Sequence, residues 1–229
     1  MTTFSSWNNS NGGLFTITQN WSPVGVPNSG SADAALPTLS QAYTVTSDLN
    51  DTLDFLEVDP KATLAITGGT FSINSSVNPF SNIYNFGAID VGAGSALALG
   101  ATASGGSAEI NDPGTVLLAG TGTTPGTIAT MRINTPYLGL YGGTQVGVSA
   151  NGQILGSTTS ATTLTVKDAT IYGGGYIGTG AGTPAGDGLT LIVTALGTIN
   201  ANGVAYAMVL ETGKADTHGG TIITLASNS

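Results

Sequence analysis

Cysteine is absent from this 229-residue chain, and positive charge is scarce, since four Lys and Arg residues stand against thirteen Asp and Glu residues. Without cysteine there can be no disulfide, no thiolate zinc site and no cysteine nucleophile. The net charge of −9 disfavours nucleic acid, whose phosphates are held by Lys and Arg, and it disfavours an anionic membrane surface. These absences remove nucleic-acid binding and thiol chemistry from the candidate functions.

Charge of either sign is rare as well. Only 7% of the residues are charged, whereas soluble domains have roughly 25%. Helices need Lys, Glu and Arg on their exposed faces, so this composition, with 35 glycines, favours strands and turns. A low charge with abundant Thr and Ser is also typical of secreted bacterial surface proteins.

Long apolar runs are missing. No stretch approaches the ~18 apolar residues of a membrane helix, so we expect no membrane span. The first twenty residues have no basic segment followed by an apolar one, so no cleavable signal peptide is visible.

The most informative stretch that is present is Asn85–Gly100. Two short runs, Ala88–Val91 and Ser95–Leu99, alternate apolar residues with small or polar ones, and Gly92-Ala93-Gly94 divides them. Alternation of period two places one set of side chains on one face of a strand, and glycine permits a sharp corner. A strand, a glycine corner and another strand form the repeating unit of a β-solenoid.

A degenerate kernel, Gly-Thr-apolar-x-apolar, recurs along the chain without a strict period, as at Gly114–Leu118 and Gly197–Asn200. About twenty short runs, taken three to a coil of ~20 or more residues, predict roughly seven coils. We therefore expect an all-β chain folded as a single parallel β-helix over residues 41–229, preceded by a cap or entry segment, 1–40. An antiparallel sandwich is the main alternative, and it is disfavoured because hairpin signals are scarce.

Period-two spacing within the kernels predicts which side chains face inward in stacked rows. The predicted inward residues are Ile66, Ile89, Val91, Leu97, Leu99, Val116, Leu118, Leu164, Val166, Leu191 and Val193.

The two ends of the predicted solenoid differ. The entry segment holds Trp7, Trp21 and three prolines, which suit a cap over the end of a stack, and alternation predicts one strand over residues 14–18. The other end carries the β-prone, uncharged run Thr221–Leu225, which is a template for pairing with another chain. The candidate assembly residues are Trp7, Trp21, Thr221, Ile222, Ile223 and Leu225.

The densest acidic cluster begins with Asp48, Asp51 and Asp54 and continues to Glu57 and Asp59. Crowded carboxylates can bind Ca²⁺, and paired carboxylates can hydrolyse glycosides. The third interpretation is a solvated turn followed by the outward face of a strand over 53–58. Strand geometry points Asp54 and Glu57 to opposite faces, which favours this third interpretation. Calcium, at Asp48, Asp51 and Asp54, is the one cofactor that remains a candidate.

Two further sets of residues are candidates for chemistry. His218 is the sole histidine, which excludes a histidine-based zinc site and leaves it a turn residue before Gly219. Tyr137, Tyr141, Tyr172 and Tyr176 form either a sugar-stacking platform or aromatic cover over the flank of the core.

Several segments carry a resemblance to a known class of proteins: Trp7-Asn8-Asn9, Asn20–Pro27, Tyr43–Thr46, Ala62–Thr70 and Asn85–Gly100. They resemble the Gly/Thr-rich parallel β-helix regions of bacterial secreted surface proteins, the adhesins and autotransporter passengers. The resemblance implies a right-handed β-helix located outside the cell at the bacterial surface. Its motifs are structural and bring no catalytic residue with them.

We therefore expect a non-enzymatic structural or adhesive protein of a bacterial surface that assembles head to tail into filaments or a layer. Its partner is a second copy or a downstream part of a longer chain. The first alternative is a carbohydrate-active β-helix, such as a polysaccharide lyase, a hydrolase or a phage tailspike. Such sites pair carboxylates with cations, and the four cations here, Lys61, Arg132, Lys167 and Lys214, are widely spaced. The second alternative is a passive glycan-binding module.

Overall fold

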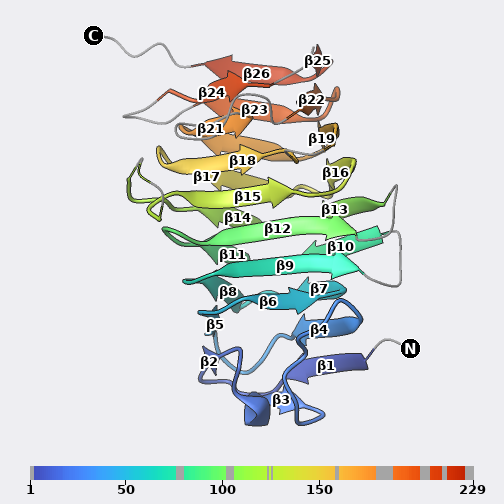
Figure 1. Ribbon diagram of the computed structural model, residues 1–229, viewed down its shortest axis with the longest axis vertical. Coiled ribbons are helices and arrows are strands. Elements are labelled where there is room, and N and C mark those ends of the chain that lie inside the picture. Colours follow the sequence, from blue (N-terminus) through green and yellow to red (C-terminus); the bar gives the residue numbers. More distant parts are fainter. Residues whose placement is uncertain are drawn as a thin grey trace.

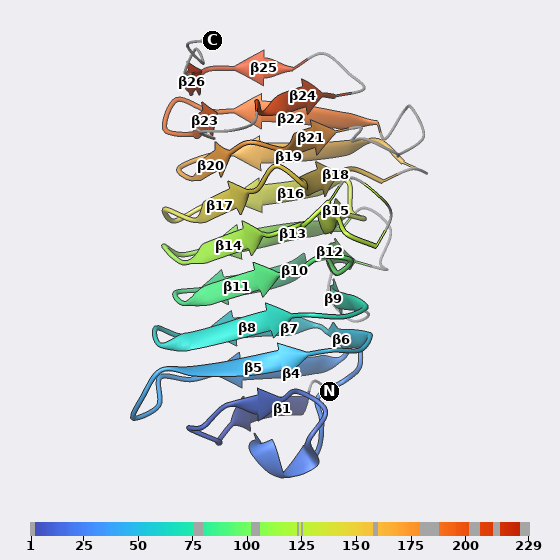
Figure 2. The ribbon, with the colours of Figure 1, turned by 90° about the vertical axis from the view of Figure 1, so that its left-hand side faces the viewer.

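The computed structural model shows a stack of short strands with the N-terminus at one end and the C-terminus at the other (Figures 1 and 2). It describes residues 3–75, 80–101, 106–122, 124, 126–157, 160–178, 188–201, 207–212 and 216–224. Within these residues there is no α-helix, and no helix long and apolar enough to cross a membrane. The predicted all-β class is confirmed.

Three sheets, which we name A, B and C, run the length of the stack. Sheet A consists of β1 (Thr3–Trp7), β3 (Trp21–Ser22), β4 (Ala32–Leu36), β7 (Phe55–Val58), β10 (Phe80–Asn85), β13 (Ser107–Asn111), β16 (Tyr137–Leu140), β19 (Thr162–Val166), β22 (Leu189–Val193) and β25 (Thr217–His218). Sheet B consists of β2 (Gly13–Leu14), β5 (Tyr43–Ser47), β8 (Ala62–Ile66), β11 (Ala88–Val91), β14 (Thr115–Leu118), β17 (Gln145–Val148), β20 (Thr170–Gly173), β23 (Thr198–Ala201) and β26 (Thr221–Thr224). Sheet C consists of β6 (Asp51–Leu53), β9 (Thr70–Ser75), β12 (Ala96–Ala101), β15 (Ala129–Ile133), β18 (Gly152–Leu155), β21 (Tyr176–Gly178) and β24 (Val209–Glu211).

Successive strands of the chain visit the three sheets in turn, so each turn of the solenoid adds one strand to each sheet. The complete turns run from β4–β5–β6 to β22–β23–β24, which gives the predicted number of about seven. Neighbouring turns pair in parallel, and only the short β1–β3 pair of the described strands is antiparallel. The sandwich alternative is thereby excluded, because its sheets would be antiparallel.

Turn length varies, as the degenerate kernel indicated. In sheet B, Val45 lies opposite Leu64, a step of 19 residues, whereas Val116 lies opposite Val146, a step of 30 residues. The extra residues fall between strands, so the strands keep their register while the corners absorb the difference.

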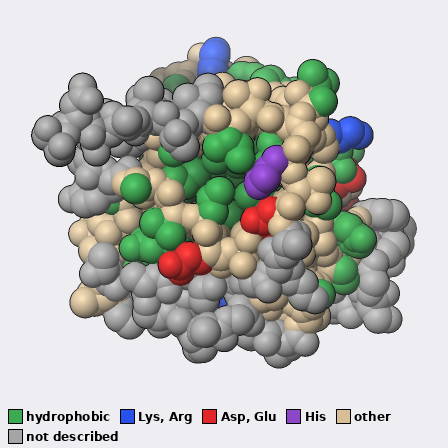
Figure 3. All heavy atoms as spheres, turned by 90° about the horizontal axis from the view of Figure 1, so that it is seen from above, with side chains coloured by type: hydrophobic (Ala, Val, Ile, Leu, Met, Phe, Trp, Pro, Cys, Tyr) green, Lys and Arg blue, Asp and Glu red, His purple; other side chains and the backbone are tan. Residues whose placement is uncertain are grey.

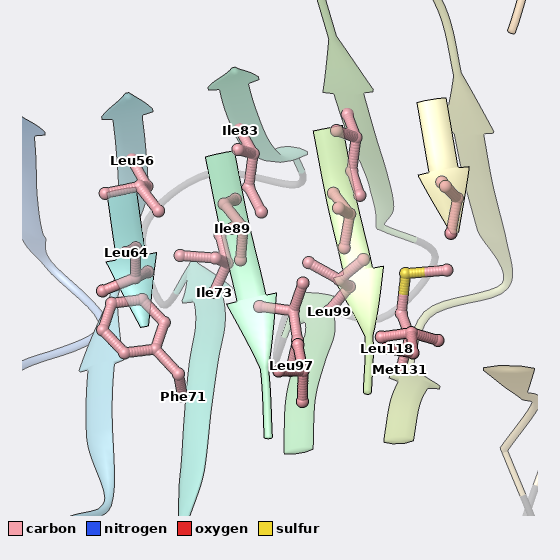
Figure 4. Close-up of a cluster of buried hydrophobic side chains, with 14 of the residues drawn as sticks. Leu56, Leu64, Phe71, Ile73, Ile83, Ile89, Leu97, Leu99, Leu118 and Met131 are labelled. Carbon is pink, nitrogen blue, oxygen red and sulfur yellow. The ribbon is translucent and has the colours of Figure 1, made fainter. Parts of the chain in front are cut away.

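The core is a narrow column of stacked inward side chains, shown in Figure 4. All eleven residues predicted to face inward are 0% exposed. In sheet B, Ile89 lies between Leu64 of the preceding turn and Val116 of the following one. Parallel registration repeats this arrangement in every turn, so each apolar position packs against its counterparts above and below.

The structure explains the Gly-Thr-apolar kernel as the corner between sheets A and B. A Cβ on Gly197 would lie 2.2 Å from the carbonyl oxygen of Val166 in the preceding turn, so only glycine fits there without a shift. Thr198 then points outward and Ile199 inward. The kernel therefore records the close approach of one turn to the next at this corner.

The N-terminal end is closed by aromatic side chains. Trp7, Phe15 and Trp21 are at most 1% exposed, and Trp21 packs edge-on against both of the others at 5.1 and 5.0 Å between ring centroids. Phe15 in turn contacts Phe71 of the core at 5.4 Å. The indole N–H of Trp21 donates to the carbonyl of Phe15 at 2.8 Å, so the buried ring leaves no polar atom unpaired.

The entry segment 1–40 is not separate from the solenoid, because β1 and β4 belong to sheet A. The predicted strand over residues 14–18 is wrong. Strand β2 ends at Leu14, and the chain then turns into a 3-10 helix, η1 (Thr18–Asn20). The turn carries Phe15 into the aromatic cap, and that burial outweighs the local alternation of apolar residues.

The C-terminal end of the core is uncovered, in contrast to the N-terminal end. The last members of three inward rows are exposed: Ile222 (41%) follows Ile199 in sheet B, Leu210 (36%) follows Ile177 in sheet C, and His218 follows Val193 in sheet A. Their predecessors in these rows are at most 1% exposed. Figure 3 looks down on this end and shows hydrophobic side chains on its surface.

We predict that truncating Ile89 to Ala lowers the free energy of unfolding by about 2–5 kcal/mol, because it leaves a cavity between two stacked neighbours. Urea denaturation measures this change. The matched control is Leu117→Ala, since Leu117 lies in the adjoining strand and is 38% exposed. A cost for Leu117→Ala equal to that for Ile89→Ala would contradict the assigned inward and outward faces.

Candidate functional site

The acidic cluster does not form one exposed patch. Asp51 is 0% exposed, Asp54 is 2% exposed and Asp48 is exposed. The carboxylate of Asp51 accepts hydrogen bonds from the amide of Asn28 at 2.9 Å and from the hydroxyl of Ser47 at 2.7 Å. The interpretation of the whole cluster as a solvated turn is therefore wrong for Asp51 and Asp54, which are buried.

The predicted calcium ligands are not brought together. Over the described part of the chain, no three His, Asp or Glu side chains gather closely enough to hold a metal ion. Asp51 sits in sheet C at the position that Phe71 occupies in the next turn, so it faces the end of the core. Burial raises the pKa of Asp51, because low polarity disfavours its charged form.

The four tyrosines do not form a single platform. Tyr172 lies in β20 of sheet B and Tyr176 in β21 of sheet C, whereas Tyr137 begins β16 of sheet A and Tyr141 follows it. Only Tyr137 and Tyr141 come together, at the rim of a recess of about 260 Å³ on the outer face of sheet A. The described residues that line this sheet A recess include Ser107, Glu109, Tyr137, Gly139, Tyr141 and Thr165.

The sheet A recess exists because Gly139 has no side chain. In the parallel register Gly139 lies between Glu109 of the preceding turn and Thr165 of the following turn. The ring of Tyr141 lies against Gly139 so closely that an added Cβ would be 2.0 Å from its Cε2 atom. The Lys167 ammonium lies 5.1 Å from the centroid of the same ring, a cation–π contact.

The electrostatic character of the recess is set by Glu109. Its Oε2 atom accepts a hydrogen bond from the amide of Asn111 at 3.1 Å, which orients the carboxylate on the outer face. The pKa of Tyr141 is raised, first by burial and then by the negative charges of Glu109 and Asp168. The recess therefore offers acceptor oxygens and aromatic surface, with Lys167 as the cation in contact with Tyr141.

Glu109, Gly139 and Thr165 are functional candidates that the sequence did not single out. They come from three successive turns, and the variable turn length hides their alignment until the register is known. The aromatic pair Tyr137 and Tyr141 was the detectable part of the site.

His218 lies at the open C-terminal end, in β25. Its neighbour Asp216 accepts a hydrogen bond from the backbone N–H of Leu191 at 2.9 Å and another from the hydroxyl of Thr212 at 2.6 Å. Asp216 thus ties the last turn to the one before it, which is a structural role.

The candidate assembly residues divide between the two ends. Trp7 and Trp21 are buried within their own chain, so they offer no surface to a second copy. Thr221 and Ile222 are exposed in β26, and Ile223 belongs to the same strand. Leu225 lies outside the described residues.

No family model, no curated protein and no solved structure matches this chain. The resemblance to bacterial surface β-helices rests on the sequence segments that carry it, and the β-helical fold is the part of it that the structure shows.

We predict that Asp51→Asn raises stability at pH 7 and flattens its pH dependence. A carboxyl whose pKa is raised in the folded state binds its proton more tightly there than in the unfolded chain, whose pKa is about 3.8. Its stabilising contribution is present at low pH and is lost as pH rises through the folded-state pKa. An Asn at this position can still accept from Asn28 and can donate to the hydroxyl of Ser47.

Thermal unfolding between pH 4 and pH 8 measures the effect, with the exposed Asp48→Asn as control. Equal pH dependence for Asp51→Asn and the unmodified chain would contradict the burial argument. Stabilisation of the unmodified chain by Ca²⁺, lost in Asp51→Asn, would restore the calcium site.

Proposed function

We propose that this protein is a non-enzymatic structural β-solenoid of a bacterial surface, and that it associates through its C-terminal end. The observation that carries the proposal is the difference between the two ends of the core. The N-terminal end is sealed by Trp7, Phe15 and Trp21, and the C-terminal end exposes Ile222 and Leu210.

The C-terminal end has the properties of an interface. Each of its final strands, β24, β25 and β26, has a paired neighbour on one side only among the described strands. An unpaired strand edge presents backbone donors and acceptors to another chain, and exposed apolar side chains reward their burial. Ile222 lies directly above the buried Ile199, so a second copy would extend an existing row of the core.

The expected assembly is a pair of copies joined at their C-terminal ends. A head-to-tail stack needs two open ends on every subunit, and the aromatic cap closes one of them. A symmetric contact needs only the open end, and it closes after two copies. This favours a dimer over the filament or layer expected from the sequence.

The composition supports a place at the bacterial surface and a structural task. A chain that is 7% charged and has a net charge of −9 resembles secreted surface proteins more than proteins that handle nucleic acid. The negative charge also opposes association at low ionic strength, so salt should favour it through screening.

Light scattering after size-exclusion chromatography tests this proposal. We expect the mass of two 22.6 kDa chains at high protein concentration, with more dimer at 0.5 M salt than at low salt. Ile222→Lys should give a monomer that unfolds like the unmodified chain, because it places a charge on the exposed interface.

The matched control is Leu117→Lys, since Leu117 has a similar exposed fraction, 38%, but lies on the side of sheet B. This variant should still dimerise. A monomer under all conditions, an open filament, or a dimer that persists in Ile222→Lys would overturn the proposed assembly.

A further inference from the structure

We propose that the outer face of sheet A binds an uncharged glycan, with the sheet A recess holding one sugar ring. This site is independent of the C-terminal end. The recess, at about 260 Å³, falls just below the range of small-molecule pockets, ~300–1,000 Å³, which suits a single sugar ring.

The residues of the recess match the two properties of a sugar ring, which are an apolar face and a rim of hydroxyls. Tyr137 is 58% exposed, so its ring is available as a flat apolar surface. Glu109 supplies carboxylate lone pairs, and Thr165 and Ser107 supply hydroxyls that both donate and accept. An oriented carboxylate beside an aromatic ring can therefore bind hydroxyls while the ring face packs.

Charge excludes the two other ligand classes. An anion, such as a phosphate or a uronic acid, would lie beside Glu109 on a chain of net charge −9. A quaternary ammonium would need a free aromatic face, but Lys167 already lies 5.1 Å from the ring centroid of Tyr141 and would repel a second cation. An uncharged ligand avoids both penalties.

A structural explanation for Tyr141 alone is available, because aromatic rings often cover a glycine within a strand. The same turn provides the comparison. On sheet B, Gly147 lies against Tyr172, with an added Cβ 2.8 Å from the tyrosine hydroxyl oxygen. That pair has Leu117 and not a carboxylate in the register position corresponding to Glu109. Glycine cover therefore occurs without a polar site, and Glu109 distinguishes the sheet A recess.

The face of sheet A extends the site beyond one ring. Two turns toward the N-terminus, Phe55 and Tyr84 form an edge-on aromatic pair at 5.3 Å, and Tyr84 is 39% exposed. Asn82 and Glu109 follow Phe55 in one outward row. A polar strip with aromatic rings at both ends fits a chain of several sugars that runs along the solenoid (Figure 1).

An array of uncharged and charged glycans, probed with the full chain, tests the inference, followed by calorimetry with the uncharged oligosaccharide that binds best. We expect an uncharged oligosaccharide to bind at least tenfold more tightly than its component monosaccharide, whose Kd should be on the order of 1 mM. Binding of a uronic acid oligomer or of choline in preference to every uncharged glycan would overturn the ligand class.

Two variants locate the site. Gly139→Thr should weaken binding at least tenfold, because its side chain fills the recess and displaces Tyr141. The control Gly147→Thr makes the same change under Tyr172 on sheet B, so it should bind normally. Tyr84→Ala should weaken the oligosaccharide and leave the monosaccharide unaffected.

Thermal unfolding of each variant confirms that it is folded, and Glu109→Gln provides a second, conservative test at the recess. No binding of any uncharged glycan, or equal loss in Gly139→Thr and Gly147→Thr, would refute the site. Neither result bears on dimerisation through β26.

Discussion

The structure depends on the requirement that every turn lies in register on the turn before it. Parallel strands ~4.8 Å apart exchange backbone hydrogen bonds, and the same positions point inward in each turn. Leu64, Ile89 and Val116 form one such row, and none of them could be buried by its own turn alone. Glycines such as Gly197 allow the corners to approach closely enough for this registration to continue.

This requirement makes the ends and the faces of the solenoid different in kind. An end exposes the core unless something covers it, and the aromatic cluster of Trp7, Phe15 and Trp21 does so at one end only. A face presents outward side chains from successive turns in straight rows, so it can assemble a site from residues far apart in sequence. Glu109, Gly139 and Thr165 are such a row, and Gly139 turns it into a recess.

The same requirement explains how much the sequence could predict. Period-two alternation within kernels identifies inward residues such as Ile89 and Val91, because each strand is regular on its own scale. It does not reveal which turns align, since the step between partners varies from 19 to 30 residues. For that reason neither the sheet A recess nor the burial of Asp51 at the end of a core row could be predicted. The failed strand over residues 14–18 has another cause, the tertiary burial of Phe15.

The absence of cysteine allows one direct test of the register. The outward residues Thr170 and Thr198 are partners in adjacent turns of sheet B, at a spacing of ~4.8 Å that falls within the ~4.4–6.8 Å range for a disulfide. The double variant with Cys at 170 and 198 should form an intramolecular disulfide under mild oxidation, detected by peptide mass mapping. Cys at 170 and 200 should not, because a shift of two residues separates their Cα atoms by about 8 Å. Efficient cross-linking of 170 to 200, with none between 170 and 198, would contradict the stacked parallel solenoid.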